Sequence, residues 1–137
     1  MRLRSMQLIG LSLCLLGCSQ SRIDRAWVSE INQNNLRVHT LVPARTARYI
    51  KSKQIYFSIV IDECREPSKR YPLEPTINGH RASGFDFDVS GDQVEFTAVS
   101  PREPMTRYSN PCVSIEGGGY SGAHVKSEQV PLSREFR

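Results

Sequence analysis

Residues 55–64 read IYFSIVIDEC, and this stretch decides the fold. Every second residue from Ile55 to Ile61 is large and apolar, and a period of two is typical of a β-strand. The residues between them include Val60, so the second face is also partly apolar. A strand with two apolar faces is expected in the middle of a sheet. This central strand runs directly into Cys64.

Other strands are predicted on both sides of this one. Residues 36–42 and 112–115 show the β-branched, partly alternating pattern of short strands. Residues 85–89 and 94–98 alternate on either side of Ser90-Gly91-Asp92, which predicts an antiparallel hairpin.

The remaining signals are weaker. Asn78-Gly79 is a typical turn dipeptide, and 120–132 predicts a last strand broken at Gly122. Short helical turns are expected over 26–31 and 45–53. Closely spaced strands with turn signals between them predict a single all-β domain, mainly antiparallel, as a small β-sandwich or barrel with one disulfide.

The N-terminus has a different character. Arg2 and Arg4 precede a nearly continuous apolar run over 6–16, as in a signal peptide. As a helix this run is about 16 Å long, which is too short for a hydrocarbon core of about 30 Å. Leu15-Leu16-Gly17-Cys18 follows, and it resembles the lipobox of bacterial lipoproteins.

In that family the cysteine thiol receives a diacylglycerol, the preceding peptide bond is cut, and acyl chains such as palmitate anchor the protein. Two or more chains anchor stably, because each buried methylene contributes roughly 0.8 kcal/mol. The resemblance implies a signal peptide over 1–17, lipidation of Cys18, a tether over 18–25 and one periplasmic domain over 26–137. Ser19, where an Asp retains lipoproteins in the inner membrane, implies the outer membrane of the cell envelope.

An envelope location gives each of the four cysteines an expected role. Cys14 leaves with the signal peptide and Cys18 carries lipid, so Cys64 and Cys112 are expected to form a disulfide in an oxidising compartment. Closing a loop of about 48 residues contributes roughly 4 kcal/mol in the chain-entropy model. A metal site or redox pair is less consistent with two distant cysteines that lack a CxxC spacing.

The mature chain is nearly balanced in charge. The full chain has 18 basic and 14 acidic residues and a net charge of +4. Arg2 and Arg4 leave with the signal peptide, which reduces the net charge to +2. This balance does not indicate a nucleic-acid partner, whose phosphates demand a strong basic excess.

No catalytic or metal-binding motif is apparent in the sequence. The chain lacks the GxSxG motif of a nucleophile elbow. His39, His80 and His124 stand apart from one another, as surface histidines do. Asp86 and Asp88 are expected on a solvated strand face, although paired carboxylates also serve acid–base chemistry or calcium binding. We expect no enzyme activity, no catalytic residue, no metal and no cofactor.

Residues 117–122 read GGGYSG, which resembles a phosphate-binding loop in composition but lacks the GxxxxGK[ST] spacing. Such a run is typical of a hairpin turn or a bulge. The alternative is a binding loop, because glycines allow close backbone approach and Tyr120 offers a rigid amphipathic side chain.

Two proline-rich loops, 65–75 and 100–111, carry further candidate contacts. The predicted disulfide brings the ends of these loops together, and Arg and Tyr are enriched at interface hot spots. Prolines lower the ordering cost of a recognition loop, although basic loop residues also serve solubility. The candidate partner-binding residues are Arg70, Tyr71, Arg107, Tyr108, Tyr120, Ser121 and Lys126.

These features favour a protein-binding function. The lipobox, the short β-rich domain with one disulfide and the lack of a catalytic motif resemble those of immunity lipoproteins, which protect a bacterium from toxins in its own periplasm. Residues 121–126 begin like the serine-glycine loop of lysozyme-inhibitor lipoproteins, but the tryptophan-rich strand of that family is missing, since Trp27 is the only tryptophan.

We therefore expect a membrane-anchored immunity protein or an inhibitor of a toxin or hydrolase. Its expected partners are the membrane, through lipid, and another protein. The alternative is an assembly accessory of an envelope or secretion complex. Such an accessory is expected to display a large apolar patch or an open sheet edge.

Overall fold

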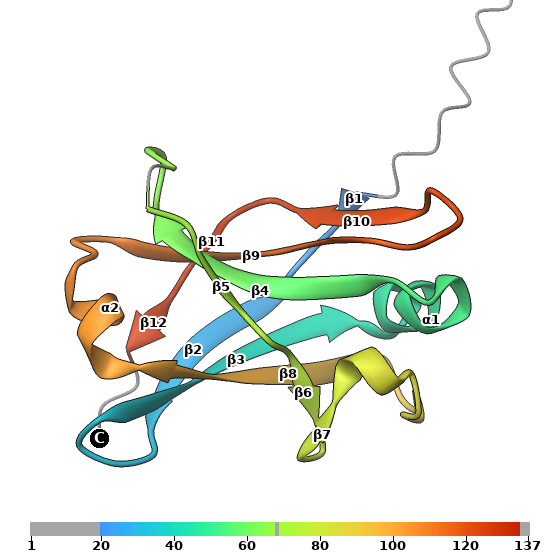
Figure 1. Cartoon of the computed structure of the whole chain (residues 1–137), viewed down its shortest axis with the longest axis horizontal. Helices are drawn as coiled ribbons and strands as arrows, with labels where there is room; N and C mark the ends of the chain where they lie inside the picture. Colours follow the sequence, from blue (N-terminus) through green and yellow to red (C-terminus); the bar gives the residue numbers. More distant parts are fainter. Residues whose placement is uncertain (1–19, 68, 135–137) are drawn as a thin grey trace, which may run out of the picture.

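Two β-sheets packed face to face form the body of the chain (Figure 1). The computed structural model describes residues 20–67 and 69–134. In spatial order, sheet A consists of β1 (Gln20–Ser21), β10 (His124–Ser127), β9 (Pro111–Gly118), β4 (Tyr56–Glu63) and β5 (Tyr71–Leu73), and β11 (Val130–Pro131) also pairs with β9. Sheet B consists of β12 (Ser133–Arg134), β2 (Arg25–Glu30), β3 (Asn35–Pro43), β8 (Gln93–Pro101), β6 (Thr76–Ile77) and β7 (His80–Arg81).

The strand pairs are mainly antiparallel, and the parallel ones, β1 with β10 and β12 with β2, involve two-residue strands. Cys64 and Cys112 form a disulfide. The predicted all-β, mainly antiparallel fold with one disulfide is therefore confirmed. The predicted signal peptide over 1–17 and the lipidation site Cys18 lie outside the described residues.

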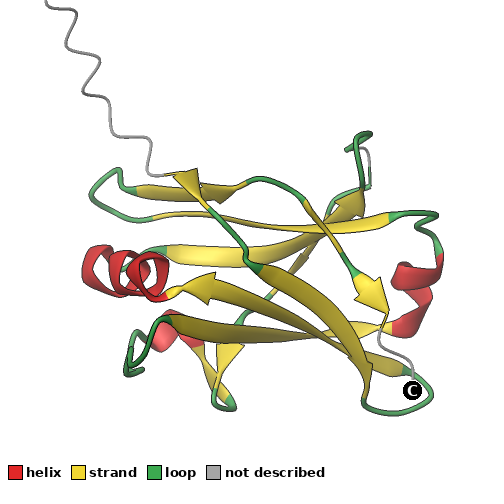
Figure 2. Ribbon diagram, turned by 180° about the vertical axis from the view of Figure 1, so that it is seen from behind, coloured by secondary structure: helices red, strands yellow, loops and turns green. Residues whose placement is uncertain are grey.

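Two helices carry the chain from sheet B to sheet A at opposite ends of the molecule (Figures 1 and 2). α1 (Ala44–Lys53) connects β3 to β4 and confirms the helical turns expected over 45–53. It ends at Gln54, which has a positive φ of 49°. α2 (Arg102–Thr106) connects β8 to β9, within a segment that was predicted only as a loop.

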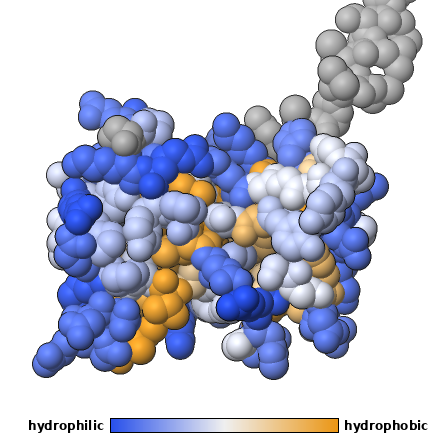
Figure 3. Space-filling model, in the orientation of Figure 1, coloured by the Kyte–Doolittle hydropathy of each residue, from blue (hydrophilic) through white to orange (hydrophobic). Residues whose placement is uncertain are grey.

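The hydrophobic core lies between the two sheets. Buried and exposed residues alternate along β3 and β8, as expected for strands with one face in the core. Most of β4 is buried on both faces, which confirms its central position. Phe57 of β4 and Phe96 of β8 pack edge to face, with ring centroids 5.0 Å apart. In the space-filling view, apolar side chains appear between hydrophilic ones across the middle of the molecule (Figure 3).

The predicted hairpin is wrong in its first half. Residues 94–98 lie in β8, but 85–89 form no strand and follow the 3-10 turn η1 (Ala82–Gly84) as an irregular segment. β8 pairs with β3 along its whole length on one side and with β6 only at Thr97 on the other, so residues 85–89 do not serve as its partner. The alternation of residues 85–89 still marked a core residue, because Phe87 packs against Phe96. Asp86 and Asp88 are exposed, as expected, but lie outside any strand.

Several other segments agree with the sequence. Residues 36–42 and 112–115 lie in β3 and β9. Asn78 and Gly79 form the turn between β6 and β7, and both have positive φ, as tight hairpin turns require. The expected last strand is divided into β10 and β11, and Gly122 lies in the turn before β10.

Two expectations near the N-terminus are wrong. Residues 26–31 are not helical, because 25–30 form β2 and pair with β3 along the whole strand. The segment assigned to the tether is folded from residue 20 onward. Gln20–Ser21 pairs with β10, and Ile23 is buried in the core. The folded body therefore begins before residue 26, because this polar-looking segment bridges sheets A and B.

Strands β9 and β4 approach each other very closely at Gly117. A Cβ atom on Gly117 would lie 2.2 Å from the carbonyl oxygen of Tyr56 and 2.4 Å from the Cα atom of Phe57. Both contacts are with backbone, which cannot rotate away as a side chain can. At Gly118, the nearest contact of an added Cβ would be 3.7 Å, to the carbonyl oxygen of Ala123.

Gly117→Ala is expected to lower the free energy of unfolding by about 3 kcal/mol, the upper part of the range for overpacking, because two backbones must separate. Gly118→Ala is the matched control and should change stability by less than about 1 kcal/mol. Urea unfolding followed by circular dichroism measures both values. Equal stabilities of the two variants would contradict the close approach of β9 and β4.

Candidate functional site

The outer face of sheet A contains a cavity of about 520 Å³, which we call the groove. It lies over β4, β9 and β10, between the loop that follows β4 and the segment that follows β10. The residues that line it are Val60, Asp62, Pro67, Arg70, Ser114, Glu116, His124, Lys126, Ser127, Glu128 and Gln129.

The floor of the groove is buried although it belongs to the outer face of a sheet. Val60 and Asp62 are each 4% exposed, and Ser114 is 6% exposed. Val60 stands directly opposite Ser114 in the pairing of β4 with β9. Outward-facing strand residues are normally solvated, so the neighbouring segments must wall this part of the sheet.

The first wall is the loop that joins β4 to β5, and Asp62 holds it in place. An Asp62 carboxylate oxygen accepts hydrogen bonds from the backbone N–H groups of Glu63 at 2.7 Å and Lys69 at 3.1 Å. The Tyr108 hydroxyl donates a hydrogen bond to the carbonyl oxygen of Lys69. Burial, followed by the negative charge of Asp62, raises the pKa of the Tyr108 phenol. Tyr108 therefore stays neutral and keeps the proton that it donates.

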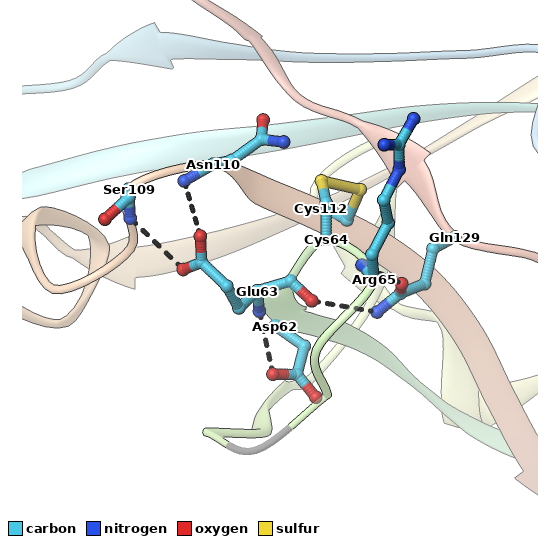
Figure 4. The surroundings of a disulfide bond; sticks show 8 residues. All are labelled: Asp62, Glu63, Cys64, Arg65, Ser109, Asn110, Cys112 and Gln129. Carbon is cyan, nitrogen blue, oxygen red and sulfur yellow. Dashed lines mark hydrogen bonds between the residues drawn. A yellow bond between two sulfur atoms is a disulfide. The ribbon is translucent and has the colours of Figure 1, made fainter.

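The second wall is the segment that follows β10, and hydrogen bonds connect it to the region of the disulfide (Figure 4). The Glu63 carboxylate accepts hydrogen bonds from the backbone N–H groups of Ser109 at 3.1 Å and Asn110 at 2.7 Å. The Gln129 side chain donates to the carbonyl oxygen of Glu63 at 3.5 Å and accepts from the backbone N–H of Arg65 at 3.3 Å. These bonds join β4, the start of β9 and the segment after β10 at one end of the groove.

Charged groups of both signs border the groove. Arg70 forms an ion pair with Glu116, and Lys126 stands opposite Glu116 in the pairing of β9 with β10. The hydrogen bond to Glu116, with the negative charges of Glu116 and Asp62, raises the pKa of the Arg70 guanidinium. The groove therefore offers fixed positive and negative positions around a buried floor, which suits a charged polypeptide segment.

The predicted partner-binding residues separate into four groups. Arg70 and Lys126 line the groove together, although 56 positions separate them in sequence. Tyr71 is half-buried against the core, and Tyr108 is buried. Arg107 is exposed near α2 and pairs with Glu103.

Tyr120 and Ser121, the last two of the seven, lie in the turn between β9 and β10. This confirms the hairpin turn expected for the glycine run. The Tyr120 side chain is 94% exposed, so it projects from one end of the molecule and does not line the groove.

The sequence did not predict a group of hydrogen-bonded side chains on the outer face of sheet B. Ser29 Oγ lies 2.7 Å from His39 Nε2, and His39 Nδ1 is hydrogen-bonded to Glu95. The Trp27 ring stacks on the His39 ring with centroids 4.8 Å apart. The sequence placed His39 in a strand, but only the pairing of β2, β3 and β8 brings these four residues together. His39 is therefore not an isolated surface histidine.

This arrangement has the order of a serine–histidine–carboxylate triad but not its setting. Ser29 lies within β2, opposite Arg37 of β3, whereas a serine nucleophile typically sits on a sharp turn beside free backbone N–H groups. The groove lies on the other sheet. The simplest account is a polar network that orders the exposed face of sheet B.

Two features are absent from the part of the chain that the structure describes. Within 20–67 and 69–134, no helix is both long enough and apolar enough to cross a bilayer. In the same ranges, no group of three or more His, Cys, Asp or Glu side chains is placed to hold a metal ion.

Comparison with known proteins gives no further guide. The chain matches no protein-family model, no curated protein and no solved structure. Its function is therefore inferred from its own residues and geometry.

A fluorophosphonate probe, which labels activated serines, is expected to leave Ser29 unmodified, because oxyanion donors are not positioned around a mid-strand serine. Intact-protein mass spectrometry measures the labelling, with a known serine hydrolase as the positive control. Labelling of Ser29 that disappears in His39→Ala would contradict this account and would establish an activated nucleophile.

Proposed function

We propose that this chain is a lipid-anchored protein of the bacterial cell envelope, and that its groove binds another protein in an immunity or inhibitor role. Leu15-Leu16-Gly17-Cys18 supports the lipid anchor, and Ser19 supports an outer-membrane location. The bound partner would be a toxin or a hydrolase that reaches the periplasm. The proposed activity is binding, without catalysis or a cofactor.

The groove is the observation that carries this proposal. Its floor is buried, and hydrogen bonds fix both walls. A recess that is ordered before binding loses little conformational entropy when a partner enters. The opposite charges of Arg70 and Glu116, with Lys126 beside them, favour a polar partner segment and select its orientation.

The sheet edges favour this proposal over the assembly alternative. The edge strands β1, β5, β7 and β12 are two or three residues long within the described part of the chain. These terminal strands offer few unpaired backbone groups to a strand from another subunit, and the longer open stretch is in β8, which pairs with β6 only at Thr97.

The lipid anchor is tested by expressing the full chain and its Cys18→Ala variant in a Gram-negative host. The wild-type protein should carry acyl chains, begin at Cys18 and fractionate with the outer membrane, whereas Cys18→Ala should lose lipid and stable membrane association. Mass spectrometry and membrane fractionation measure these outcomes. A Cys18→Ala protein that still carried lipid would exclude the lipobox assignment.

The groove is tested by using the lipidated protein as bait against the organism's toxins, its envelope proteins and a set of lysozymes. A complex with a toxin or hydrolase is expected. Lys126→Glu should then weaken its affinity about tenfold, because it places like charges together in the groove.

Arg81→Glu is the control for that substitution, since Arg81 is exposed on β7, in the other sheet. Calorimetry or surface plasmon resonance gives the affinities. Equal losses in the two variants would exclude the groove as the binding site, and capture of envelope-machine subunits would favour the assembly role.

A further inference from the structure

Three aromatic side chains form a cluster at the end of the molecule that carries α1. The ring of Tyr56 packs edge to face against Phe85 at 5.1 Å and against Tyr120 at 5.9 Å between centroids. Tyr120 is 94% exposed and Tyr56 is 47% exposed. We call Tyr56, Phe85 and Tyr120 the aromatic cluster. Exposed aromatic residues in contact with one another are unusual without a partner surface.

Helix α1 places positive charge beside this cluster. It contains Arg45, Arg48, Lys51 and Lys53 and no acidic residue. The tip of the β9–β10 hairpin lies against the end of this helix, because a Cβ on Gly119 would come within 3.0 Å of the carbonyl oxygen of Lys53.

Acidic groups also occur at this end, close to the cationic helix. Asp86, Asp88 and Asp92 are exposed and belong to the segment between η1 and β8. That segment lies beside sheet B, whereas the hairpin tip belongs to sheet A (Figure 1). The segment also packs on α1, where the Lys51 ammonium donates to the carbonyl oxygen of Phe87 at 2.5 Å and the Ala44 N–H donates to that of Asp92 at 2.8 Å.

β1 lies beside β10, the strand that leads out of the hairpin tip. β1 runs parallel to β10, with Gln20 opposite Lys126. Gln20 is therefore the residue of β1 that lies nearer to the hairpin tip. Covalent geometry keeps the Cα atom of Cys18 within about 7 Å of that of Gln20.

We infer that this end of the domain lies on the surface of a phospholipid bilayer with anionic headgroups, an inference that rests on the proposed lipidation of Cys18. Tyrosine favours the headgroup region, where its ring and its hydroxyl are both accommodated. Each Arg or Lys close to an anionic surface favours contact about fivefold. The lipid then fixes the orientation of the domain as well as its location, and the groove opens sideways into the periplasm.

Fluorescence quenching tests this orientation in the lipidated protein. Tyr120→Trp places a reporter in the cluster, and Ile31→Trp places a matched reporter in the turn between β2 and β3, at the opposite end (Figure 1). Trp27 contributes the same background to both variants. Each protein is reconstituted into vesicles of phosphatidylethanolamine and phosphatidylglycerol that contain a spin-labelled phospholipid.

The expected result is a loss of fluorescence from Tyr120→Trp and no loss beyond the Trp27 background from Ile31→Trp. Adding Arg48→Gln to Tyr120→Trp should reduce about fivefold the ratio of molecules whose aromatic cluster contacts the membrane to molecules whose cluster does not. Replacing phosphatidylglycerol by phosphatidylcholine should reduce this ratio by at least the same factor.

Equal quenching of Tyr120→Trp and Ile31→Trp would overturn the inferred orientation and leave the lipid anchor intact. Mass spectrometry of the same samples separates the two proposals, because a chain without lipid on Cys18 would overturn both. Quenching that is insensitive to phosphatidylglycerol and to Arg48→Gln would overturn the role of the anionic headgroups.

Discussion

The pairing of β4 with β9 is the constraint on which the rest of this structure depends. Tyr56–Glu63 stands opposite Pro111–Gly118 without interruption. The disulfide between Cys64 and Cys112 joins the two strands at one end, and Gly117 permits their close approach near the other. The remaining strands of sheet A attach to this pair directly or through β10. A shift in its register would turn apolar side chains away from the core.

The groove also depends on the pairing of β4 with β9. The inward residues of β4 and β9 fill the core, and the outward residues Val60, Asp62 and Ser114 form the floor. The disulfide end holds both walls through Glu63 and its neighbours (Figure 4). The hairpin end carries the exposed tyrosine. One strand pair thus supports the groove on one side and, in the proposed orientation, the membrane-facing end at its tip.

The sequence predicted features that depend on local pattern and missed those that depend on pairing. The alternation from Ile55 to Ile61 predicted a central strand, and the cysteine count predicted the disulfide, because both signals lie in the residues themselves. The first half of the predicted hairpin failed, since β8 pairs along its whole length with β3, a strand far earlier in the sequence. Arg70 and Lys126 were selected by residue type, but their shared groove arises only from the order of strands. Ser29 and His39 likewise come together only because β2 pairs with β3.

Amide hydrogen exchange in the oxidised protein and in a Cys64→Ala/Cys112→Ala double variant tests most directly whether this strand pair holds the groove. The informative amides are those of Lys69 and Arg65, which bond to the side chains of Asp62 and Gln129. Removal of the disulfide should cost these wall amides far more protection than the amides of β3 in sheet B. If wall and β3 amides lose protection by the same factor, the disulfide stabilises the whole fold without holding the groove, and the central claim fails.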